Sequence, residues 1–255
     1  MSTVLVDQRP SGVEPAAAPV LESAGIPTTP ARIQPGGCVR LVSLLSAIAL
    51  IPMIIAHVIG ASVVNPFTDP ISWYAFVPGG AALIMIGGSI LALLGALITI
   101  RMYQGGLAAG PLPAIMMAIF CAAMIMVGVV HTVPDAALQH VRAVTETHGA
   151  MIGATIHRIS AGAAFAVLPV VGLLITRSIS RPRTGLPRLL RRAAYLLAVL
   201  VGVFLSIHLP LAFAGSGIAA FGFLERAGFV VMIGYLFLLA RVIDCESPGP
   251  PAIRR

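Results

Sequence analysis

The stretch His148–Arg177, HGAMIGATIHRISAGAAFAVLPVVGLLITR, decides what kind of protein this chain forms. A helix that crosses a bilayer needs about 20 mostly apolar residues, and this stretch is long enough. It nevertheless carries His157 and Arg158 in its first half. Small residues recur at every fourth position around His157 and share its helix face: Gly149, Gly153 and Ala161. Because small residues let helices approach closely, we expect His157 to face protein and not lipid, which makes it a candidate functional residue.

The composition of the whole chain agrees with a membrane location. Hydrophobic residues make up 58% of the chain and charged residues 10%, whereas soluble domains average about 45–50% and 25%. The net charge of +7 comes from arginine without any lysine, which we interpret as codon bias in a GC-rich bacterium. These arginines lie where membrane topology requires them, so we expect no nucleic-acid partner. The expected partners are membrane lipids and a small-molecule or lipid ligand.

Hydropathy divides the chain into three parts and predicts an all-α fold. Residues 1–40 are rich in proline and small residues and are predicted to be a disordered cytoplasmic tail. Residues 41–243 are predicted to form a bundle of six transmembrane helices, and residues 244–255 a second cytoplasmic tail. The predicted spans are residues 41–64, 76–100, 113–131, 150–176, 193–214 and 224–243.

Loop charges predict the orientation of the bundle. The loop from Arg177 to Arg192 holds six arginines and no acidic residue. Asp69, Asp135 and Glu146 lie in loops on the opposite side. The positive-inside rule therefore places both termini in the cytoplasm of a bacterial plasma membrane protein.

Small residues spaced four apart predict the packing faces of three further spans. These residues are Gly88, Ala92 and Ala96 in the second span, Ala114, Ala118 and Ala122 in the third, and Ala194, Ala198, Gly202 and Ser206 in the fifth.

Polar residues gather in the outer half of the predicted bundle. The set comprises His57, His131, His140, His148, His157, His208, Asp69, Asp135, Glu146, Glu225 and Arg226. Ionisable groups are costly in lipid unless they find partners or water, so this asymmetry predicts a polar pocket that opens outward. The alternative is a structural network between helices. His140 and His148 also fit a solvent-exposed loop, and Trp73 and Tyr74 fit the aromatic belt at the membrane surface.

Three segments resemble the six-helix bacterial membrane family called domain of unknown function 998. The fourth span, THGAMIGATIHRISAGAAFAVLP, matches its pattern around His157, and GFLERAGFVVMIGYLFLLARVI matches a closing G-x-x-[EQ]-R pattern at Glu225 and Arg226. GVVHTVPDA is similar to the turn after span three, with Asp135 as the acid, although His131 and Val133 depart from the usual order. NPFTDPISWYAF is more loosely similar to the first outer loop. The resemblance covers residues 41–243 and implies the fold and topology, but no activity.

Several chemistries remain open for this pocket. Histidine with a carboxylate forms an acid–base pair, so His157 with Asp135 or Glu225 is the first hypothesis. Glu225 and Arg226 diverge by about 100° on a helix, so each needs a different partner, with Arg158 or a histidine expected for Glu225. The candidate catalytic residues are His157, Asp135, Glu225 and Arg226, and the candidate ligand-binding residues are His57, His131, Arg158, His208 and Asp69.

Two alternatives involve a metal or a cofactor, whose identity stays unknown. A metal-dependent membrane hydrolase would use His131, Asp135, His157 and His208 as ligands. A haem b protein would use two of His57, His131, His157 and His208 as axial ligands.

Overall fold

The computed structural model describes residues 37–131, 144–213 and 218–247, all within one compact unit, Ile33–Arg255. Its long helices are α1 (Gly37–Gly60), α2 (Gly80–Gln104), α3 (Leu112–Val129), α5 (Val144–Ser178), α6 (Leu186–Phe213) and α7 (Phe221–Glu246), and a short 3-10 helix is η1 (Ile71–Phe76). The six long helices each contain a segment long and apolar enough to cross a membrane. The prediction of an all-α, six-span membrane protein is confirmed.

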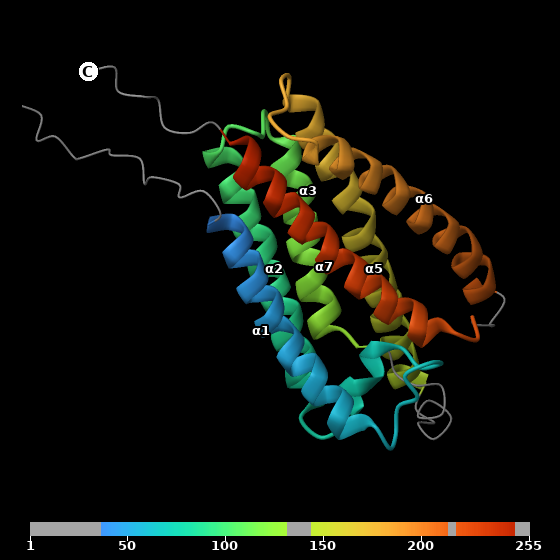
Figure 1. Cartoon of the computed structure of the whole chain (residues 1–255). Coiled ribbons are helices and arrows are strands. Elements are labelled where there is room, and N and C mark those ends of the chain that lie inside the picture. Colours follow the sequence, from blue (N-terminus) through green and yellow to red (C-terminus); the bar gives the residue numbers. More distant parts are fainter. Residues whose placement is uncertain (1–36, 132–143, 214–217, 248–255) are drawn as a thin grey trace, which may run out of the picture. The chain divides into compact units, whose positions relative to one another are not determined.

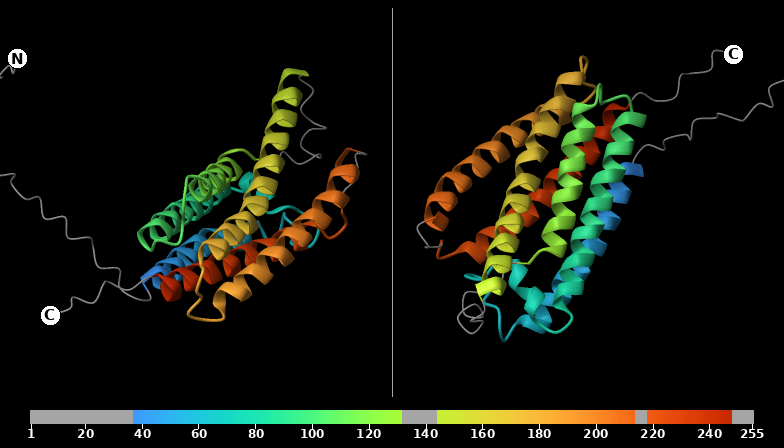
Figure 2. Two further views of the ribbon diagram at one scale, coloured as in Figure 1. Left: turned by 90° about the horizontal axis from the view of Figure 1, so that it is seen from above. Right: turned by 180° about the vertical axis from the view of Figure 1, so that it is seen from behind.

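The six helices form a closed ring. Each helix packs on its neighbours in the chain, and α7 returns to pack on α1 (Figures 1 and 2). The contact between α6 and α7 is the least extensive in the ring. We call one end of the bundle the loop end; it comprises residues 61–79 and the helix ends beside them. The opposite end, which contains the connecting residues 105–111 and 179–185, is called the arginine end.

The helix boundaries around the first loop differ from the prediction. The first two spans were expected at 41–64 and 76–100, but α1 ends at Gly60 and α2 begins at Gly80. Gly79 adopts a φ of 76°, which an L side chain rarely accepts, and this stops α2 from extending back to residue 76. Helix α5 begins earlier than expected, at Val144, so His148 belongs to the helix and not to the preceding loop.

The core lies inside the ring, and its tightest helix pair is α2 with α3. Gly88 and Gly128 meet there: a Cβ atom added to Gly88 would lie 2.6 Å from the carbonyl oxygen of Met124. Large apolar side chains fill the remaining interior, among them Leu94, Ile98, Phe120, Leu168 and Leu236.

The predicted small-residue faces are right for α2 in part and wrong for α3 and α6. Gly88 and Ala92 are buried, but Ala96 is exposed. Bulkier residues form the buried face of α3, including Met117, Phe120 and Met124, while Ala118 and Ala122 are exposed. Of the four predicted residues of α6, only Ala194 is buried, and Ala198, Gly202 and Ser206 are exposed. Alanine is apolar enough to face lipid as readily as protein, so spacing alone does not choose the face.

Two carboxylates at the end of α7 fasten the arginine end. Asp244 accepts hydrogen bonds from the backbone N–H groups of Cys38 (3.1 Å) and Val39 (2.8 Å), which lie in the first turn of α1. Glu246 accepts hydrogen bonds from the backbone N–H groups of Arg183 (2.8 Å) and Thr184 (2.9 Å) in the loop between α5 and α6. Helix α1 therefore begins before residue 41, and helix α7 ends after residue 243, the two predicted boundaries of the bundle.

Candidate functional site

Arg226 of α7 holds three elements together at the loop end. Its Nε atom donates to Nε2 of His57 on α1 at 2.9 Å. Its Nη1 atom donates to the carbonyl oxygens of Asp69 (2.9 Å) and Gly222 (2.8 Å). Its Nη2 atom donates to the Tyr74 hydroxyl at 3.2 Å. The guanidinium therefore joins α1, the first loop and η1 to α7.

The contacts of His57 fix its tautomer. Its Nδ1 atom lies 3.2 Å from the carbonyl oxygen of Met53, which can only accept a hydrogen bond, so Nδ1 carries a proton. Its Nε2 atom accepts from Arg226, which can only donate, so Nε2 carries none. His57 is consequently neutral, and both of its ring nitrogens are occupied within the protein.

Tyr74 is buried at this junction, which corrects its predicted place in the aromatic belt. It is 1% exposed, and its ring centroid lies 4.4 Å from that of His57. The Arg226 guanidinium lies 5.5 Å from the Tyr74 ring centroid, within the range of a cation–π interaction. Gly60 makes room for the ring, because a Cβ atom there would overlap it.

Asp69 organises the loop itself. One carboxylate oxygen accepts from the backbone N–H of Asn65 (2.8 Å), and the other accepts from the Thr68 hydroxyl (2.8 Å). The same turn is attached to α7, since the backbone N–H of Phe223 donates to the Phe67 carbonyl at 3.0 Å and the two rings stack. The Asp69 carboxylate thus serves the turn, while its carbonyl oxygen meets Arg226.

Glu225 faces a different partner from Arg226, as their adjacency predicts. Its Oε2 atom accepts a hydrogen bond of 2.6 Å from the backbone N–H of Ile71, the first residue of η1. The expected partner was Arg158 or a histidine, but in the structure a backbone group takes that place.

His157 faces the protein, as predicted: it is only 5% exposed. Its Nδ1 atom lies 2.6 Å from the carbonyl oxygen of Val130, just beyond the end of α3. Because that carbonyl only accepts, Nδ1 carries a proton, and when the ring is neutral Nε2 keeps its lone pair.

His157 and Glu225 line the same cavity between α1, α2, α3, α5, α7 and η1. The cavity has a volume of about 80 Å³. Apolar residues such as Met53, Leu91 and Phe229 make up most of its walls, and Ser72 is also in the lining. His157 and Glu225 thus line one cavity, whereas Arg226 binds His57 and the first loop.

The family model described as "Protein of unknown function (DUF998)" matches residues 43–242, nearly the whole bundle. The chain belongs to this family. The match confirms the resemblance read from the sequence. Comparison with curated proteins and with solved structures gives no match.

The other candidate ligand-binding residues of this DUF998 protein do not line the cavity. His131 follows α3 and is partly buried, and burial lowers the pKa of its imidazole despite a hydrogen bond with the Gly128 backbone. His208 of α6 stacks between Phe204 and Phe221, with centroid distances of 5.2 and 5.0 Å. Arg158 is exposed on α5.

The geometry gives the metal and haem hypotheses no support within the described ranges. No three His, Cys, Asp or Glu side chains converge there to hold a metal ion, so His131, His157 and His208 do not form a metal centre among themselves. Asp135, the fourth ligand of that hypothesis and a candidate catalytic residue, lies outside the described residues. As a haem ligand, His57 would have to give up its bond to Met53 or Arg226.

Sequence reasoning missed the groups that hold the polar residues of this DUF998 chain in place. Three are backbone groups: the Val130 carbonyl, the Asp69 carbonyl and the Ile71 N–H. Backbone groups have no signature in a sequence. The inward position of Tyr74 was missed as well, and it depends on Gly60, where a Cβ atom would overlap the ring.

Proposed function

We propose that this DUF998 protein binds a small hydrogen-bonding molecule, or the polar group of a lipid, in the cavity of His157 and Glu225. We further propose that it lies in a bacterial plasma membrane with the loop end facing outward. The observation that carries the proposal is the placement of an imidazole and a carboxyl group, from α5 and α7, in the wall of one mostly apolar cavity. Ionisable residues inside a membrane bundle mark functional sites by default.

The two side chains suit proton exchange with a bound group. Val130 holds the His157 ring in the tautomer whose Nε2 is a base. Ile71 engages Oε2 of Glu225, which leaves Oε1 to accept or donate a proton. A base and an acid at one site form a general acid–base pair.

The cavity limits the size of what binds. At about 10–15 Å³ for each water-sized group, a volume of 80 Å³ holds roughly six such groups. A polar group of a few non-hydrogen atoms fits, whereas a whole lipid headgroup with its chains does not. A lipid would therefore insert only its polar tip.

The test is a thermal-shift measurement on the full chain in mild detergent. Glycerol, ethanolamine and acetate are the free probes, and monoolein carries a glycerol group on an acyl chain. We expect at least one probe to raise Tm in the native protein but not in His157→Gln or Glu225→Gln. Glu246→Gln, a carboxylate change at the other end of α7, is the matched control and keeps the shift.

The outcomes separate a functional site from a structural one. A shift that monoolein produces and glycerol does not would identify a lipid as the source of the polar group. Equal shifts in the native protein and both cavity variants would overturn the proposal. A shift retained in His157→Gln but lost in Glu225→Gln would show that binding needs no proton exchange with His157, because an amide does not exchange a proton near neutral pH.

A further inference from the structure

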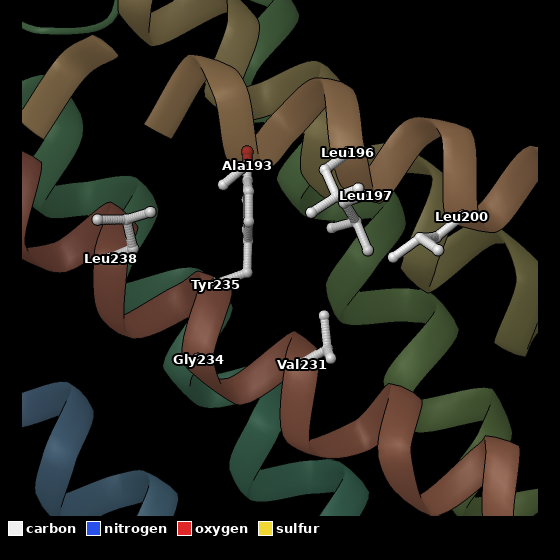
Figure 3. A pocket seen from close by; sticks show the side chains of 8 residues that line it. All are labelled: Ala193, Leu196, Leu197, Leu200, Val231, Gly234, Tyr235 and Leu238. Atoms are coloured by element: carbon white, nitrogen blue, oxygen red, sulfur yellow. The ribbon is translucent and has the colours of Figure 1, made fainter. Parts of the chain in front are cut away.

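A groove lies between α6 and α7, where the ring of helices packs least extensively. It has a volume of about 160 Å³. Figure 3 shows side chains from both helices along its walls, including Leu196, Leu197 and Leu200 of α6 and Val231, Tyr235 and Leu238 of α7. Every side chain labelled there is uncharged, and Leu196 is 61% exposed. The groove is therefore apolar and open to the surroundings of the bundle.

One row of side chains on α6 joins this groove to a group of arginines. Residues four apart on a helix share a face, and this row consists of Arg188, Arg192, Leu196 and Leu200. All four side chains are exposed. The two leucines line the groove, and the two arginines continue the row toward the arginine end. Arg191, which is also exposed, is a surface neighbour of Arg188 three residues away. The exposed face of α6 thus changes from cationic to apolar over about 6 Å, the rise of four residues.

These arginines have no anionic partner in the part of the chain that the structure describes. None of the three makes a hydrogen bond or an ion pair with a described residue. The acidic side chains described at this end, Asp244 and Glu246, already accept hydrogen bonds from backbone N–H groups. Arg188 lies in the first turn of α6, which contains no acidic residue, and the N-terminal end of a helix favours anions over cations. An anion from outside the chain would therefore stabilise this face.

We propose that Arg188, Arg191 and Arg192 bind the phosphate of an acidic membrane phospholipid whose acyl chain lies in the α6–α7 groove. Guanidinium groups donate paired hydrogen bonds that suit a phosphate. Three positive charges without a counter-charge favour a headgroup of net negative charge. The apolar walls complement a hydrocarbon chain. This site is separate from the His157–Glu225 cavity, and the inference does not depend on the proposed function.

The dimensions of one lipid leaflet fit this arrangement. Tyr195 is 55% exposed and lies one turn beyond Arg192, as expected for a tyrosine at the membrane surface. Half of a bilayer's hydrocarbon core is about 15 Å thick. Along α6 the distance from Arg192 to Leu200 is about 12 Å at 1.5 Å per residue. A lipid whose phosphate lies at Arg192 therefore fills the groove without leaving its own leaflet.

The test uses the full chain in phosphatidylcholine nanodiscs that contain a trace of photoactivatable lipid. One probe is phosphatidylglycerol with a diazirine on its acyl chain, and the other is phosphatidylcholine with the same chain. Both probes carry a phosphate, but only phosphatidylglycerol has a net negative charge. We expect phosphatidylglycerol to crosslink to residues 193–200 or 231–238 more strongly than phosphatidylcholine does.

Charge variants test the headgroup site. Arg188→Gln combined with Arg192→Gln should lower the phosphatidylglycerol crosslinking by at least about tenfold, the loss expected from one charge-assisted hydrogen bond. The double variant keeps four of the six arginines of the loop that is expected to set the topology. Arg40→Gln is the matched control, because it removes an exposed arginine from the first turn of α1 at the same end of the bundle. It should leave the crosslinking unchanged.

A second pair of variants tests the groove. A Cβ atom added at Gly234 meets no atom within 4 Å, so a larger side chain there fills the groove without a clash. Gly202 of α6 is equally open but does not line the groove. Gly234→Leu should lower the crosslinking, and Gly202→Leu should not.

Four results would overturn the proposal. Equal labelling by the two probes would remove the selection for an acidic headgroup. Full labelling in the double arginine variant, or an equal loss in Arg40→Gln, would remove the headgroup site on α6. Full labelling in Gly234→Leu would remove the acyl chain from the groove. Nanodiscs that hold two chains, with the groove shielded from both probes, would assign the groove to a second copy of the protein.

Discussion

Replacing Arg226 by methionine tests whether one guanidinium holds the loop end together. Methionine keeps the length and the apolar stem of the side chain but removes every donor. Three of the lost hydrogen bonds join α7 to other parts of the protein, namely those to His57, Asp69 and Tyr74. A hydrogen bond to a charged group contributes about 1.5–3 kcal/mol. Because the bonds of one group are not additive and Arg226 is only partly buried, we expect a loss of about 3 kcal/mol in total.

The assay can separate the loop from the helices. Trp73 is the only tryptophan of the chain, and it lies on η1, against the cluster of Ala56, Tyr74 and Ile84. Its fluorescence therefore reports the loop, while circular dichroism reports the helices. At about 2–4 °C per kcal/mol for a domain of this size, Tm should fall by about 10 °C. The Trp73 transition should precede the loss of helix.

Two further variants make the outcome decisive. Arg226→Lys keeps a charge but not the planar fork of donors, so its stability should fall between the native protein and Arg226→Met. Arg241→Met removes an exposed arginine from the same helix and should change Tm by less than the experimental spread. A Trp73 transition in Arg226→Met that coincides with the native one would refute the reasoning.

Three other predictions follow from the packing, the titration and the topology. Gly88→Val should destabilise the protein by about 2 kcal/mol or more through overpacking, because its Cβ atom would lie 2.6 Å from the Met124 carbonyl oxygen. Gly202→Val is the control, since a Cβ atom there meets no atom within 4 Å. Thermal unfolding of both variants checks this, and equal Tm values would contradict it. Burial lowers the pKa of His131, so the unfolded chain binds the proton more readily and stability should fall as the pH drops below about 6.5. Tm measured against pH should show a smaller fall in His131→Asn, and an unchanged slope would remove His131 as the cause. Single cysteines, introduced after the native ones are replaced, should be labelled from outside intact cells near His140 but not between Arg177 and Arg192; labelling of that loop would reverse the orientation.

The fold was predictable because a membrane helix depends on length and composition, and both are visible in a sequence. The six predicted spans match the six long helices for that reason. The boundaries failed where one residue's backbone decides them, as at Gly79. The packing faces of α3 and α6 failed because an alanine in a bilayer gains similar stabilisation from lipid and from protein, so only the bulk of Met117 and Phe120 chose the face.

The candidate site was predictable in its depth but not in its connections. His157 and Glu225 belong to the same level of the bundle, and they do line one cavity. What holds them could not be read from the sequence, because the Val130 carbonyl and the Ile71 N–H are backbone groups, which do not depend on the side chain. The role of Arg226 was obscured for the same reason, since two of its four acceptors are backbone carbonyls.

The carboxylate of Asp244 has a consequence for how the protein is made. It accepts hydrogen bonds from the first turn of α1, so the start of α1 is completed by a residue synthesised 206 positions after Cys38. During translation, α1 must wait in the membrane with those N–H groups lacking this partner while the intervening spans are inserted. Ring closure is therefore a late event of biogenesis. A chain that stops before Asp244 would present an open bundle to the proteases that survey newly inserted membrane proteins.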